Sequence, residues 1–474
     1  MRAAECSRFR AENAEVTRRT EQAGEVGVNE AVKQDLQIEA HGADGPGDAK
    51  LSGGMAPDAA PELTVALLTG GADRPYVFGL GTSLMREVAG LDVIGSDDLD
   101  FPEFRSQPSV SFLNLRGSHR TDVNALKKVF RILMYYARLI RYAATAKPKI
   151  FHILWNNKIE IFDRTLLMLY YRFLGKKIVR TVHNVNAGKR DLNDSSLNRL
   201  TLRIQYRLTR HLFVHTEQMK RELTEEFGVE GRRVTVIPFG INNAVPNTAL
   251  TPPDAKRHLG IPDGSKTILF FGNITPYKGL EYLIAAFHQL QASGEDYRLI
   301  IAGKPDNCEE YWSEVRESVA EDVRRGQVLL KASFIPDRDT EIYFKAADVL
   351  VLPYRHVYQS GVLFLGQSFG LPVIAADVGS LKDEIVEGET GFIFTPEDSA
   401  DLAKTIERYF ASDLFAELDR RRPAIRDDAA KNHSWEVVAK MTAAVYADLL
   451  RVPYAGRMPD RDVSSASADV NAPS

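Results

Sequence analysis

The feature that most constrains the fold is a regular alternation of short apolar runs with longer amphipathic stretches, which begins near Leu63. The apolar runs have strand length and are rich in Val, Ile, Leu and Phe, a pattern typical of strands in a parallel sheet covered on both faces. The stretches between them have helix length, so the pattern predicts successive β-α-β units. In the first half, the predicted strands are 63–71, 110–115, 149–155, 176–184, 211–216 and 233–243, and the predicted helices are 123–146, 163–174, 196–210 and 217–227.

The same alternation restarts after the connector "PPDAKRHLGIP" (252–262). The sequence therefore predicts an α/β protein with two successive doubly wound domains, joined near 240–253. Ligands of such sheets bind outside the carboxyl ends of the strands, so we expect the site in a cleft between the two domains. In the second half, the predicted strands are 266–274, 297–304, 328–335, 347–354, 372–377 and 391–396, and the predicted helices are 278–292, 309–323, 338–346, 361–369 and 435–451.

Composition divides the chain into a structured body and two flanking segments. Residues 1–60 and 453–474 are poor in aromatic residues and rich in small and polar ones, and we expect both to be disordered. We expect an N-terminal domain over 61–240, a C-terminal domain over 241–434 and a last helix over 435–452.

Charge and cysteine content exclude several classes of protein. The net charge of −4 gives no basic field for nucleic acid, and none is expected as a partner. The two cysteines, Cys6 and Cys308, are far apart and predict no disulfide framework. The sequence has no apolar run of membrane-spanning length and no apolar leader, so we expect a cytoplasmic protein.

Glycines and a lysine follow two of the predicted strands. In "TGGADRPYVFGLGTSL", Gly70 and Gly71 allow a ligand to approach the backbone, and Gly79 and Gly81 are expected to precede a helix. The alternative is a tight strand-to-helix turn with no ligand. In "FFGNITPYKGLEYLI", Gly272 gives close approach and Lys278 stands at a helix start, where its charge opposes the helix dipole. An anion such as a diphosphate would compensate that charge; the alternative is a solvated lysine.

Two further loops carry polar residues at predicted strand ends. Ser360 and Gly361 open a helix, and the amides of Gly361, Val362 and Leu363 are expected to be free to bind phosphate. The alternative for Ser360 is a simple helix cap. His183, in "TVHNVNAGKR", is followed by a polar loop and is interpreted as an open position in the cleft, although a lone histidine is more often structural.

Five motifs in order make the chain similar to one enzyme family. They are "VIPFGIN", "FFGNITPYKGLEYLIAAF", "FIPDRDTEIYFKAADVLVLPY", "SGVLFLGQSFGLPVIAADVGSLKDEIVEGETGFIF" and "HSWEVV". The sequence resembles glycosyltransferase family 4 over nearly all of 63–450. The resemblance implies the GT-B fold, retaining chemistry, no required metal or other cofactor, and a nucleoside-diphosphate (NDP) sugar bound mainly by the C-terminal domain. It also implies an acceptor bound mainly by the N-terminal domain, to which helix 435–452 would cross back.

The resemblance assigns roles to individual residues. Lys278 matches the lysine that contacts the donor phosphates, and Asn273 stands where many members have an arginine. Ser360 and Gly361 fall in the loop whose amides meet the sugar and phosphates. His183 matches a position near the reacting face of the donor sugar. Phe334 and Ile335 lie where backbone groups hold the base.

The sequence departs from the family at two carboxylates. Most members have two glutamates eight residues apart, and Val357 and Leu365 occupy those places. Tyr358, Gln359 and Ser360 are then the candidates for sugar contacts, with Gln367 a weaker one. A retaining mechanism on one face of the sugar needs no enzymic nucleophile, so activity is still expected, with Lys278 and helix amides stabilising the leaving diphosphate.

We therefore predict a retaining, metal-independent hexosyltransferase that uses an NDP-sugar and a carbohydrate or lipid-linked glycan acceptor. Two alternatives stay open: a catalytically silent sugar-nucleotide binder, favoured by the missing glutamates, and a sugar-nucleotide epimerase. The Asp98-x-Asp100 pair resembles a metal motif but is expected to have no such role.

One amphipathic segment suggests contact with a membrane surface. Residues 126–149 contain seven Lys or Arg residues and no acid. We expect Val129, Ile132, Leu133, Tyr136, Leu139 and Ile140 to pack on the domain, and the basic side to assist reversible attachment to anionic lipid on the inner face of the plasma membrane. Residues 162–174, in contrast, are expected to form a core helix rather than a lipid groove.

Overall fold

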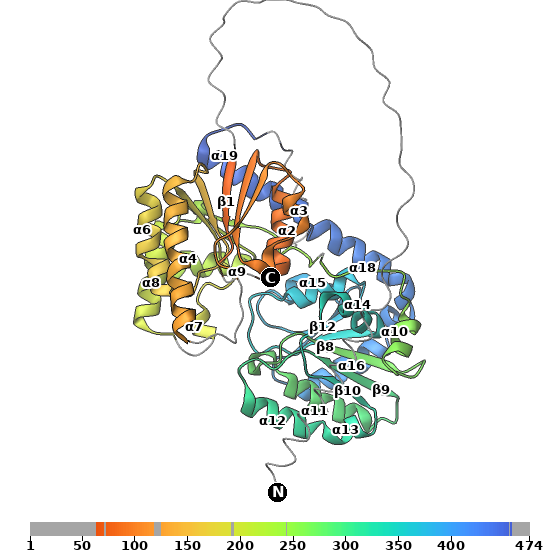
Figure 1. The fold of residues 1–474 in the computed structure, drawn as a ribbon. Helices are drawn as coiled ribbons and strands as arrows, with labels where there is room; N and C mark the ends of the chain where they lie inside the picture. The colour runs from red at the N-terminus through yellow and green to blue at the C-terminus, as the bar shows by residue number, and fades with distance from the viewer. Residues whose placement is uncertain are drawn as a thin grey trace, which may run out of the picture. The chain divides into compact units, whose positions relative to one another are not determined.

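The computed structural model describes residues 63–70, 73–117, 125–190, 194–242, 244–454 and 456. The disorder expected for 1–60 and for nearly all of 453–474 lies outside these residues. The described chain contains two all-parallel sheets, one in each half of the sequence (Figure 1). The predicted α/β class with two doubly wound sheets is confirmed.

The first sheet has seven strands in the order β3-β2-β1-β4-β5-β6-β7. The strands are β1 (Thr64–Leu68), β2 (Gly90–Gly95), β3 (Val110–Asn114), β4 (Ile150–Ile153), β5 (Lys177–Thr181), β6 (His211–Val214) and β7 (Val234–Val236). Its helices are α2 (Arg74–Leu84), α3 (Pro102–Arg105), α4 (Ala125–Thr145), α5 (Glu160–Arg164), α6 (Leu166–Phe173), α7 (Ala187–Arg190), α8 (Ser196–Leu208) and α9 (Glu217–Glu225), with 3₁₀ turns η1 (Asp97–Leu99) and η2 (Gly231–Arg233).

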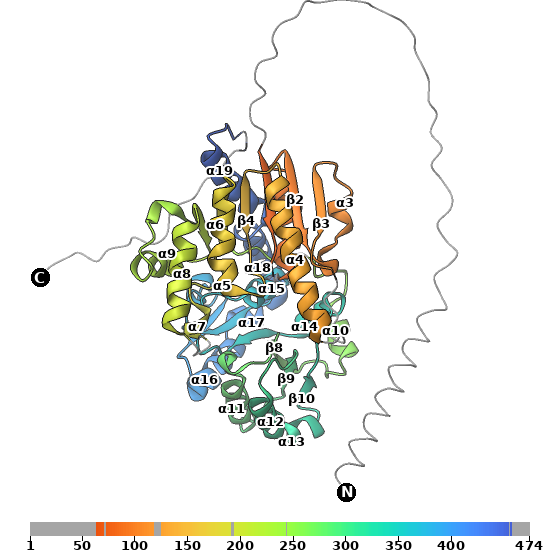
Figure 2. The same ribbon diagram turned by 60° about the vertical axis from the view of Figure 1, so that its left-hand side comes forward.

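Helices cover both faces of this sheet because successive side chains of inner strands such as β1 point to opposite faces and, from Val65 to Leu68, are all apolar. Val65 and Leu67 of β1 belong to one core cluster, which also includes residues of α2, and Ala66 and Leu68 belong to another. The second cluster contains α4 and α6, which lie side by side with α8 in Figure 2. Burial on both faces accounts for the near-continuous apolar runs in the sequence.

The second sheet has six strands in the order β10-β9-β8-β11-β12-β13. The strands are β8 (Lys266–Phe271), β9 (Tyr297–Ala302), β10 (Val328–Lys331), β11 (Val349–Leu352), β12 (Val373–Ala376) and β13 (Gly391–Phe394). Around it lie α10 (Pro252–His258), η3 (Pro276–Lys278), α11 (Leu280–Gln291), α12 (Glu309–Ser318), α13 (Ala320–Arg324), α14 (Asp337–Ala346), α15 (Gly361–Ser368), η4 (Lys382–Glu384), α16 (Ser399–Phe410), α17 (Asp413–Ala416) and α18 (Leu418–Asn432).

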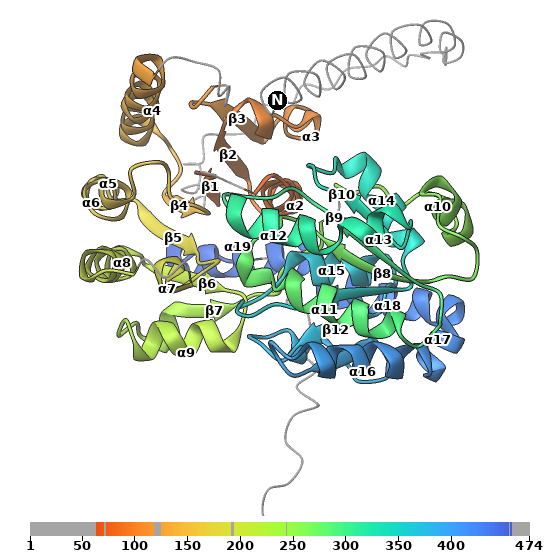
Figure 3. The same cartoon turned by 90° about the horizontal axis from the view of Figure 1, so that it is seen from below.

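The last helix, α19 (Trp435–Leu450), packs with the first sheet although it follows the second in sequence. Trp435, Val438 and Tyr446 share a core cluster with β1 and α2. In Figure 3, α19 runs beside β5 and β6 on the side opposite α6 and α8. This helix therefore returns the chain to its first half.

Several local predictions were wrong. Strand β2 and helix α2 were not predicted, and Gly79 and Gly81 lie inside α2 rather than before a helix. The predicted strand 233–243 ends at Val236. Helices α16 to α18 were also missed.

Two amphipathic helices are less buried than predicted. On α4, Tyr136 and Leu139 are buried as expected. Val129 and Leu133, in the first half of the helix, are instead exposed to solvent. The helix predicted at 163–174 as core buries only one side, since Leu169 and Phe173 of α6 are exposed.

Candidate functional site

A cavity of about 410 Å³ lies at the carboxyl ends of the strands, as expected for parallel sheets. Residues from both halves of the chain line it. The first half and α19 contribute Asp73, Pro75, Tyr76, Phe239, Gly240 and Trp435; the second half, with its incoming segment, contributes Asn242, Val245, Phe271, Gly272, Asn273, Gly303, Lys304, Phe334, Ile335, Asp337, Thr340, Gly361, Val362 and Leu365. Six predicted site residues, Gly272, Asn273, Phe334, Ile335, Gly361 and Val362, are brought together here.

Glycines allow the ends of β8 and β9 to approach each other closely. Gly272 has a φ of 99°, in the region that disfavours side chains. A Cβ at Gly303 would lie 1.8 Å from the carbonyl oxygen of Gly272, which no real side chain tolerates. Backbone is therefore exposed to the cavity at this edge of the second sheet.

Lys278 lies behind that glycine turn. Lys278 is only 7% exposed, and a Cβ at Gly272 would lie 3.0 Å from the Nζ of Lys278. Its ammonium faces the ring of Tyr354 at 5.6 Å and has no ion pair or hydrogen bond within the described residues. Burial lowers the pKa of Lys278 to about 8. The ammonium is therefore a buried positive charge with no compensating group among the described residues. Such a charge favours the binding of an anion.

Helix α15 begins at the cavity. Ser360 occupies the cap position without accepting a capping hydrogen bond, and its Oγ lies 3.3 Å from the hydroxyl of Tyr354. Gly361 and Val362 line the cavity, but Leu363 does not, because its side chain is fully buried in the core. The amide of Leu363 also donates to the carbonyl of Ser360 at 3.1 Å, so the expectation that it is free was wrong.

Tyr358 does not face the cavity. Its hydroxyl donates to the carboxylate of Glu222 on α9, and its side chain joins a core cluster of the first half. Tyr358 was predicted to contact the sugar, but its side chain instead connects the two halves of the chain. Gln359 beside it is half-buried, and its Oε1 has no hydrogen-bond partner. Gln367 donates to the carbonyl of Glu384 and is buried.

Phe334 and Ile335 form one end of the cavity. Phe334 is 71% exposed, whereas Ile335 is buried. An exposed aromatic ring at a cavity mouth offers a flat apolar surface to a planar ligand such as a base.

The two positions where most family members have glutamates lie in apolar surroundings in the structure. Leu365 lines the cavity, and Val357 packs against the core of the second half. Two other carboxylates, Asp73 and Asp337, line the cavity instead. Both were missed, although each lies just after a predicted strand, at the carboxyl edge where a search for ligands is most productive.

These carboxylates influence each other. Enclosure is the main cause that raises the pKa of Asp73 to about 6, and the nearby charge of Asp337 contributes to that rise. Asp337 accepts an ion pair from Arg74 at 3.4 Å, which links α2 to α14. Lys304, exposed at the end of β9, was also missed and lines the cavity beside Asn273.

The wall from the first half is aromatic. The indole of Trp435 fits between Gly79 and Gly240, where a Cβ would approach it to 2.1 Å and 2.3 Å respectively. Its Nε1 donates to the carbonyl of Ile241 at 2.6 Å. Tyr76 meets Trp435 edge to face at a centroid distance of 4.9 Å. Gly79, which was expected to precede a helix, therefore makes room for the ring of Trp435.

His183 lies behind this wall rather than in an open polar position, so that interpretation was wrong. Its ring stacks on Trp155 at 3.9 Å and meets Tyr76 edge to face at 4.7 Å. Burial lowers its pKa well below the usual value, with His215 adding to the effect. Its Nε2 is buried without a hydrogen-bond partner. The imidazole is therefore neutral near pH 7, and its Nε2 is enclosed without a partner among the described residues.

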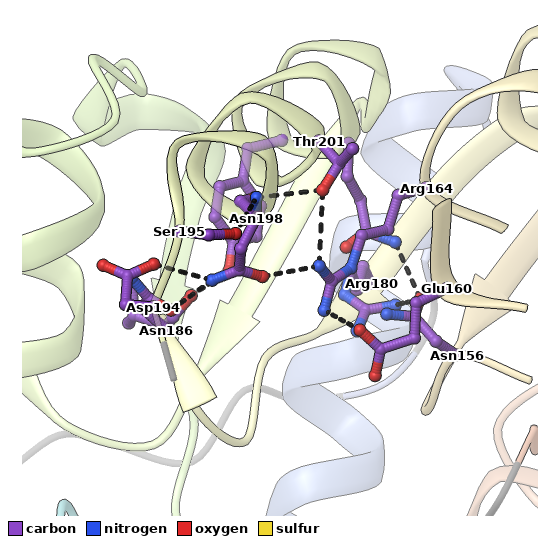
Figure 4. Close-up of polar contacts among 12 residues, drawn as sticks. Asn156, Glu160, Arg164, Arg180, Asn186, Asp194, Ser195, Asn198 and Thr201 are labelled. Atoms are coloured by element: carbon purple, nitrogen blue, oxygen red, sulfur yellow. Dashed lines mark hydrogen bonds and ion pairs between the residues drawn. The ribbon is translucent and has the colours of Figure 1, made fainter. Parts of the chain in front are cut away.

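A polar network holds the loop that carries His183 (Figure 4). Nη1 of Arg164 on α5 donates to Asn198 Oδ1 at 2.8 Å, and Asn198 Nδ2 donates to Asn186 Oδ1 at 2.8 Å. Arg164 also donates to the hydroxyl of Thr201 at 3.3 Å. The segment after β5 is thereby fastened to α5 and α8.

Two remaining predictions concern Gly71 and metal ligands. Gly71 lies outside the described residues. Asp100 is engaged by Arg105 at 2.8 Å, and the described part of the chain contains no group of three or more side chains with metal-ligand chemistry.

Two family models match consecutive parts of the chain. The model described as Glycosyltransferase Family 4 matches residues 76–245, and the model described as Glycosyl transferases group 1 matches residues 253–427. They correspond to the parts of the chain that carry the first and the second sheet.

Two curated proteins illustrate the relatives that this chain resembles in sequence. D-inositol 3-phosphate glycosyltransferase of Acidothermus cellulolyticus is 30% identical over 248 residues, covering 50% of this chain and 53% of that protein. Glycogen synthase of Mycobacterium tuberculosis is 28% identical over 282 residues, covering 58% of this chain and 64% of that protein. The aligned part of this chain spans about half to two thirds of the length of such relatives.

Solved structures share the fold. Sucrose-phosphate synthase from Thermosynechococcus elongatus has a TM-score of 0.66 at 20% identity, covering 82% of this chain and 99% of that one. HepE of Anabaena, crystallised with UDP-glucose, has a TM-score of 0.62 at 14% identity, covering 81% of this chain and 99% of that one. The two-sheet architecture is that of the GT-B glycosyltransferases.

Proposed function

The chain belongs to glycosyltransferase family 4, and on that premise we propose that it transfers a hexosyl unit from an NDP-sugar to a carbohydrate or lipid-linked glycan acceptor. The observation that carries this proposal is the buried, unpaired ammonium of Lys278 behind the Gly272 turn of the cavity. A donor diphosphate supplies the negative charge that this position lacks.

The second half of the chain binds the donor. Lys278, together with the amides of Gly361 and Val362, holds the diphosphate, because helix N-termini and buried cations both stabilise anions. Lys304 supplies the second positive charge that Asn273 does not. Phe334 and Ile335 receive the base, and Asn273, Gln359 and Ser360 contact the sugar.

The proposed reaction retains configuration and needs no metal or other cofactor. The acceptor oxygen bonds to the anomeric carbon on the face from which the nucleotide leaves. The bond from that carbon to the β-phosphate oxygen breaks, and the nucleoside diphosphate departs with the electron pair. The acceptor proton passes to a phosphate oxygen, so no enzymic nucleophile is consumed. Lys278 and the α15 amides stabilise the charge that develops on the diphosphate.

The first half binds the acceptor. Its aromatic wall of Tyr76, Phe239 and Trp435 offers stacking surfaces for the apolar face of a sugar ring. His183, behind this wall, orients an acceptor hydroxyl that reaches its unpaired Nε2. The named relatives act on inositol 3-phosphate and make glycogen, so both a phosphorylated small molecule and a glycan are acceptor classes to test.

The structure supports a peripheral attachment to anionic lipid through α4. The described residues contain no helix long and apolar enough to cross a membrane. The first half of α4, however, exposes Leu126, Val129, Phe130, Leu133 and Met134 beside Lys127 and Lys128. Apolar side chains that insert at the interface and lysines that meet anionic headgroups together favour reversible binding, whereas the sequence of 126–149 had suggested attachment through the basic side alone.

Flotation with anionic and neutral vesicles tests this attachment. We expect binding to the anionic vesicles only, and its loss in Phe130→Glu/Leu133→Glu. Val323→Glu, an exposed apolar site on α13 in the second half, is the control and should still bind. Equal behaviour toward both kinds of vesicle contradicts the attachment.

A second candidate function, sugar-nucleotide binding without transfer, is favoured by the apolar side chain of Leu365 in the cavity. A panel of UDP-, GDP- and ADP-sugars separates the candidates. Slow release of the nucleoside diphosphate, unaffected by a chelator, supports the metal-independent transferase. Binding without release supports the silent binder, and an isomerised donor indicates an epimerase. The anomeric configuration of the product then tests retention.

A further inference from the structure

A second large cavity, of about 540 Å³, lies at the other edge of the first sheet. Lys177 begins β5, His211 begins β6, and Arg233 directly precedes β7; all three line this cavity. Because the strands are parallel, their amino ends lie at the edge opposite the proposed donor cavity. The two cavities share no lining residue.

The charge of this basic pocket is strongly unbalanced. Its acidic lining residues are Glu230 and Asp448, and Glu230 already pairs with Arg232 at 2.6 Å. The basic lining residues outnumber them and are Arg172, Lys176, Lys177, Arg207, Arg210, Arg232 and Arg233. Such a concentration of like charge costs free energy unless an anion relieves it.

Part of this basic cluster serves the fold. Helices α6, α8 and α19 all end here, and their last carbonyls need donors. Lys177 donates to the carbonyl of Leu449, and Arg233 donates to that of Tyr206 at 2.9 Å. These helix C-termini carry a partial negative charge and offset part of the positive charge, but the formal charge of the lining residues stays strongly positive. Burial lowers the pKa of Arg233, and Arg210 and Arg172 lower it further.

Arg207 and Arg210 are not used in this way. Neither guanidinium forms a hydrogen bond or an ion pair with any residue that the structure describes. They flank Leu208 and Thr209, at the end of α8, and line the pocket from neighbouring positions. Planar guanidinium groups bind phosphate through paired N–H donors.

We propose that the basic pocket is a second anion site, which binds a compact multivalent phosphate group through Arg207 and Arg210. The group belongs either to a small soluble phosphate compound or to a phospholipid headgroup. Bound there, it offsets the positive charge of the basic side chains that line the pocket, next to the last residues of α19.

Calorimetric titration with inorganic pyrophosphate tests the site. The titration uses full-length Lys278→Ala protein, so that the diphosphate site of the donor cavity does not contribute. We expect saturable binding of one pyrophosphate, weakened at least tenfold by adding Arg207→Ala/Arg210→Ala. Arg203→Ala, one turn earlier on α8 and outside the pocket, is the matched control and should bind as before.

Thermal unfolding of the same proteins keeps the result interpretable. Pyrophosphate should raise the Tm of the Lys278→Ala protein and not that of the triple variant. Absence of saturable binding, or binding that the double substitution leaves unchanged, overturns the proposal. A loss of binding in Arg203→Ala equal to that in the double substitution also overturns it.

Flotation with vesicles that contain phosphatidic acid distinguishes the two sources of phosphate. If the headgroup is the ligand, Arg207→Ala/Arg210→Ala weakens flotation and pyrophosphate competes with it. If a soluble compound is the ligand, the substitutions abolish pyrophosphate binding while flotation is unchanged.

Discussion

The two walls of the donor cavity differ in kind. The wall from the second half consists of glycine turns, the start of α15, Lys304 and Asp337, with the buried Lys278 behind the Gly272 turn. The wall from the first half consists of aromatic rings, with the neutral His183 behind them and the carboxylate of Asp73 at the edge. One wall therefore attracts an anion and the other does not. Under the proposed function, the charged donor would bind against the first wall and the uncharged acceptor hydroxyl against the second.

Lys278→Met should give the largest effect. Removing the buried cation behind the Gly272 turn should lower turnover by about 100- to 1000-fold, the usual effect of losing one group that stabilises developing charge. The same substitution should raise the free energy of unfolding by about 1–3 kcal/mol, because an unpaired buried charge is removed. Steady-state kinetics and urea unfolding measure the two effects.

Lys404→Met, at an exposed position of α16, is the control for Lys278→Met and should change neither quantity. Near-normal turnover in Lys278→Met would contradict the proposal that Lys278 binds the donor diphosphate. Loss of both turnover and stability would show that the lysine is structural.

His183→Phe tests the other wall. Phenylalanine preserves the stacking on Trp155 but removes the unpaired Nε2. We expect kcat/KM for the acceptor to fall about two- to tenfold, the usual effect of losing one hydrogen bond, while donor affinity changes less than about twofold. A large loss of donor affinity would erase the difference between the walls.

The pH dependence of donor binding should follow Lys278. Its pKa is lowered to about 8, so its ammonium is present below that pH and is lost as the pH rises. Donor affinity should fall about tenfold between pH 7 and pH 9, since about one tenth of the ammonium remains one unit above its pKa. Lys278→Arg should retain its charge and abolish this decline; a decline that persists in Lys278→Arg would assign the titration to another group.

The same shift has a consequence for stability. The folded pKa lies below the unfolded value of about 10.5, so the buried charge destabilises the fold fully below pH 8. This cost is relieved as the pH rises from 8 toward 10.5.

Lys304→Ala should give the smallest effect. The side chain is exposed at the cavity mouth, where solvent screens its charge, so donor affinity should fall only about three- to tenfold. Asn273→Arg in the Lys304→Ala protein should restore affinity if the two positions share one role. If Lys304→Ala leaves the donor affinity unchanged, Lys278 and not Lys304 supplies the positive charge that binds the donor.

Sequence reasoning located the donor wall because its residues are local. Gly272, Phe334 and Gly361 each follow a strand that its apolar run makes recognisable, and parallel strands bring their carboxyl ends to one edge. Asp73 and Lys304 obey the same rule and could have been found by it. The helix after β1 was hidden by its glycines, which look like turn residues until Trp435 is known to pack on them.

Long-range contacts explain the remaining errors. Tyr358 looked like a sugar contact, but its partner, Glu222, is 136 residues away in the sequence. His183 looked exposed because polar residues follow it, yet Trp155 and Tyr76 enclose it. No local pattern predicts which side chains from distant segments will surround such a position.

The central claim is that a donor diphosphate binds against Lys278. Calorimetric titration at pH 7 with the nucleoside diphosphate identified by the donor panel measures this directly in wild-type and Lys278→Met proteins. We predict one site per chain in the wild type and an affinity at least 30-fold lower in Lys278→Met, with Lys404→Met unchanged. Equal affinity in wild-type and Lys278→Met proteins would contradict the account.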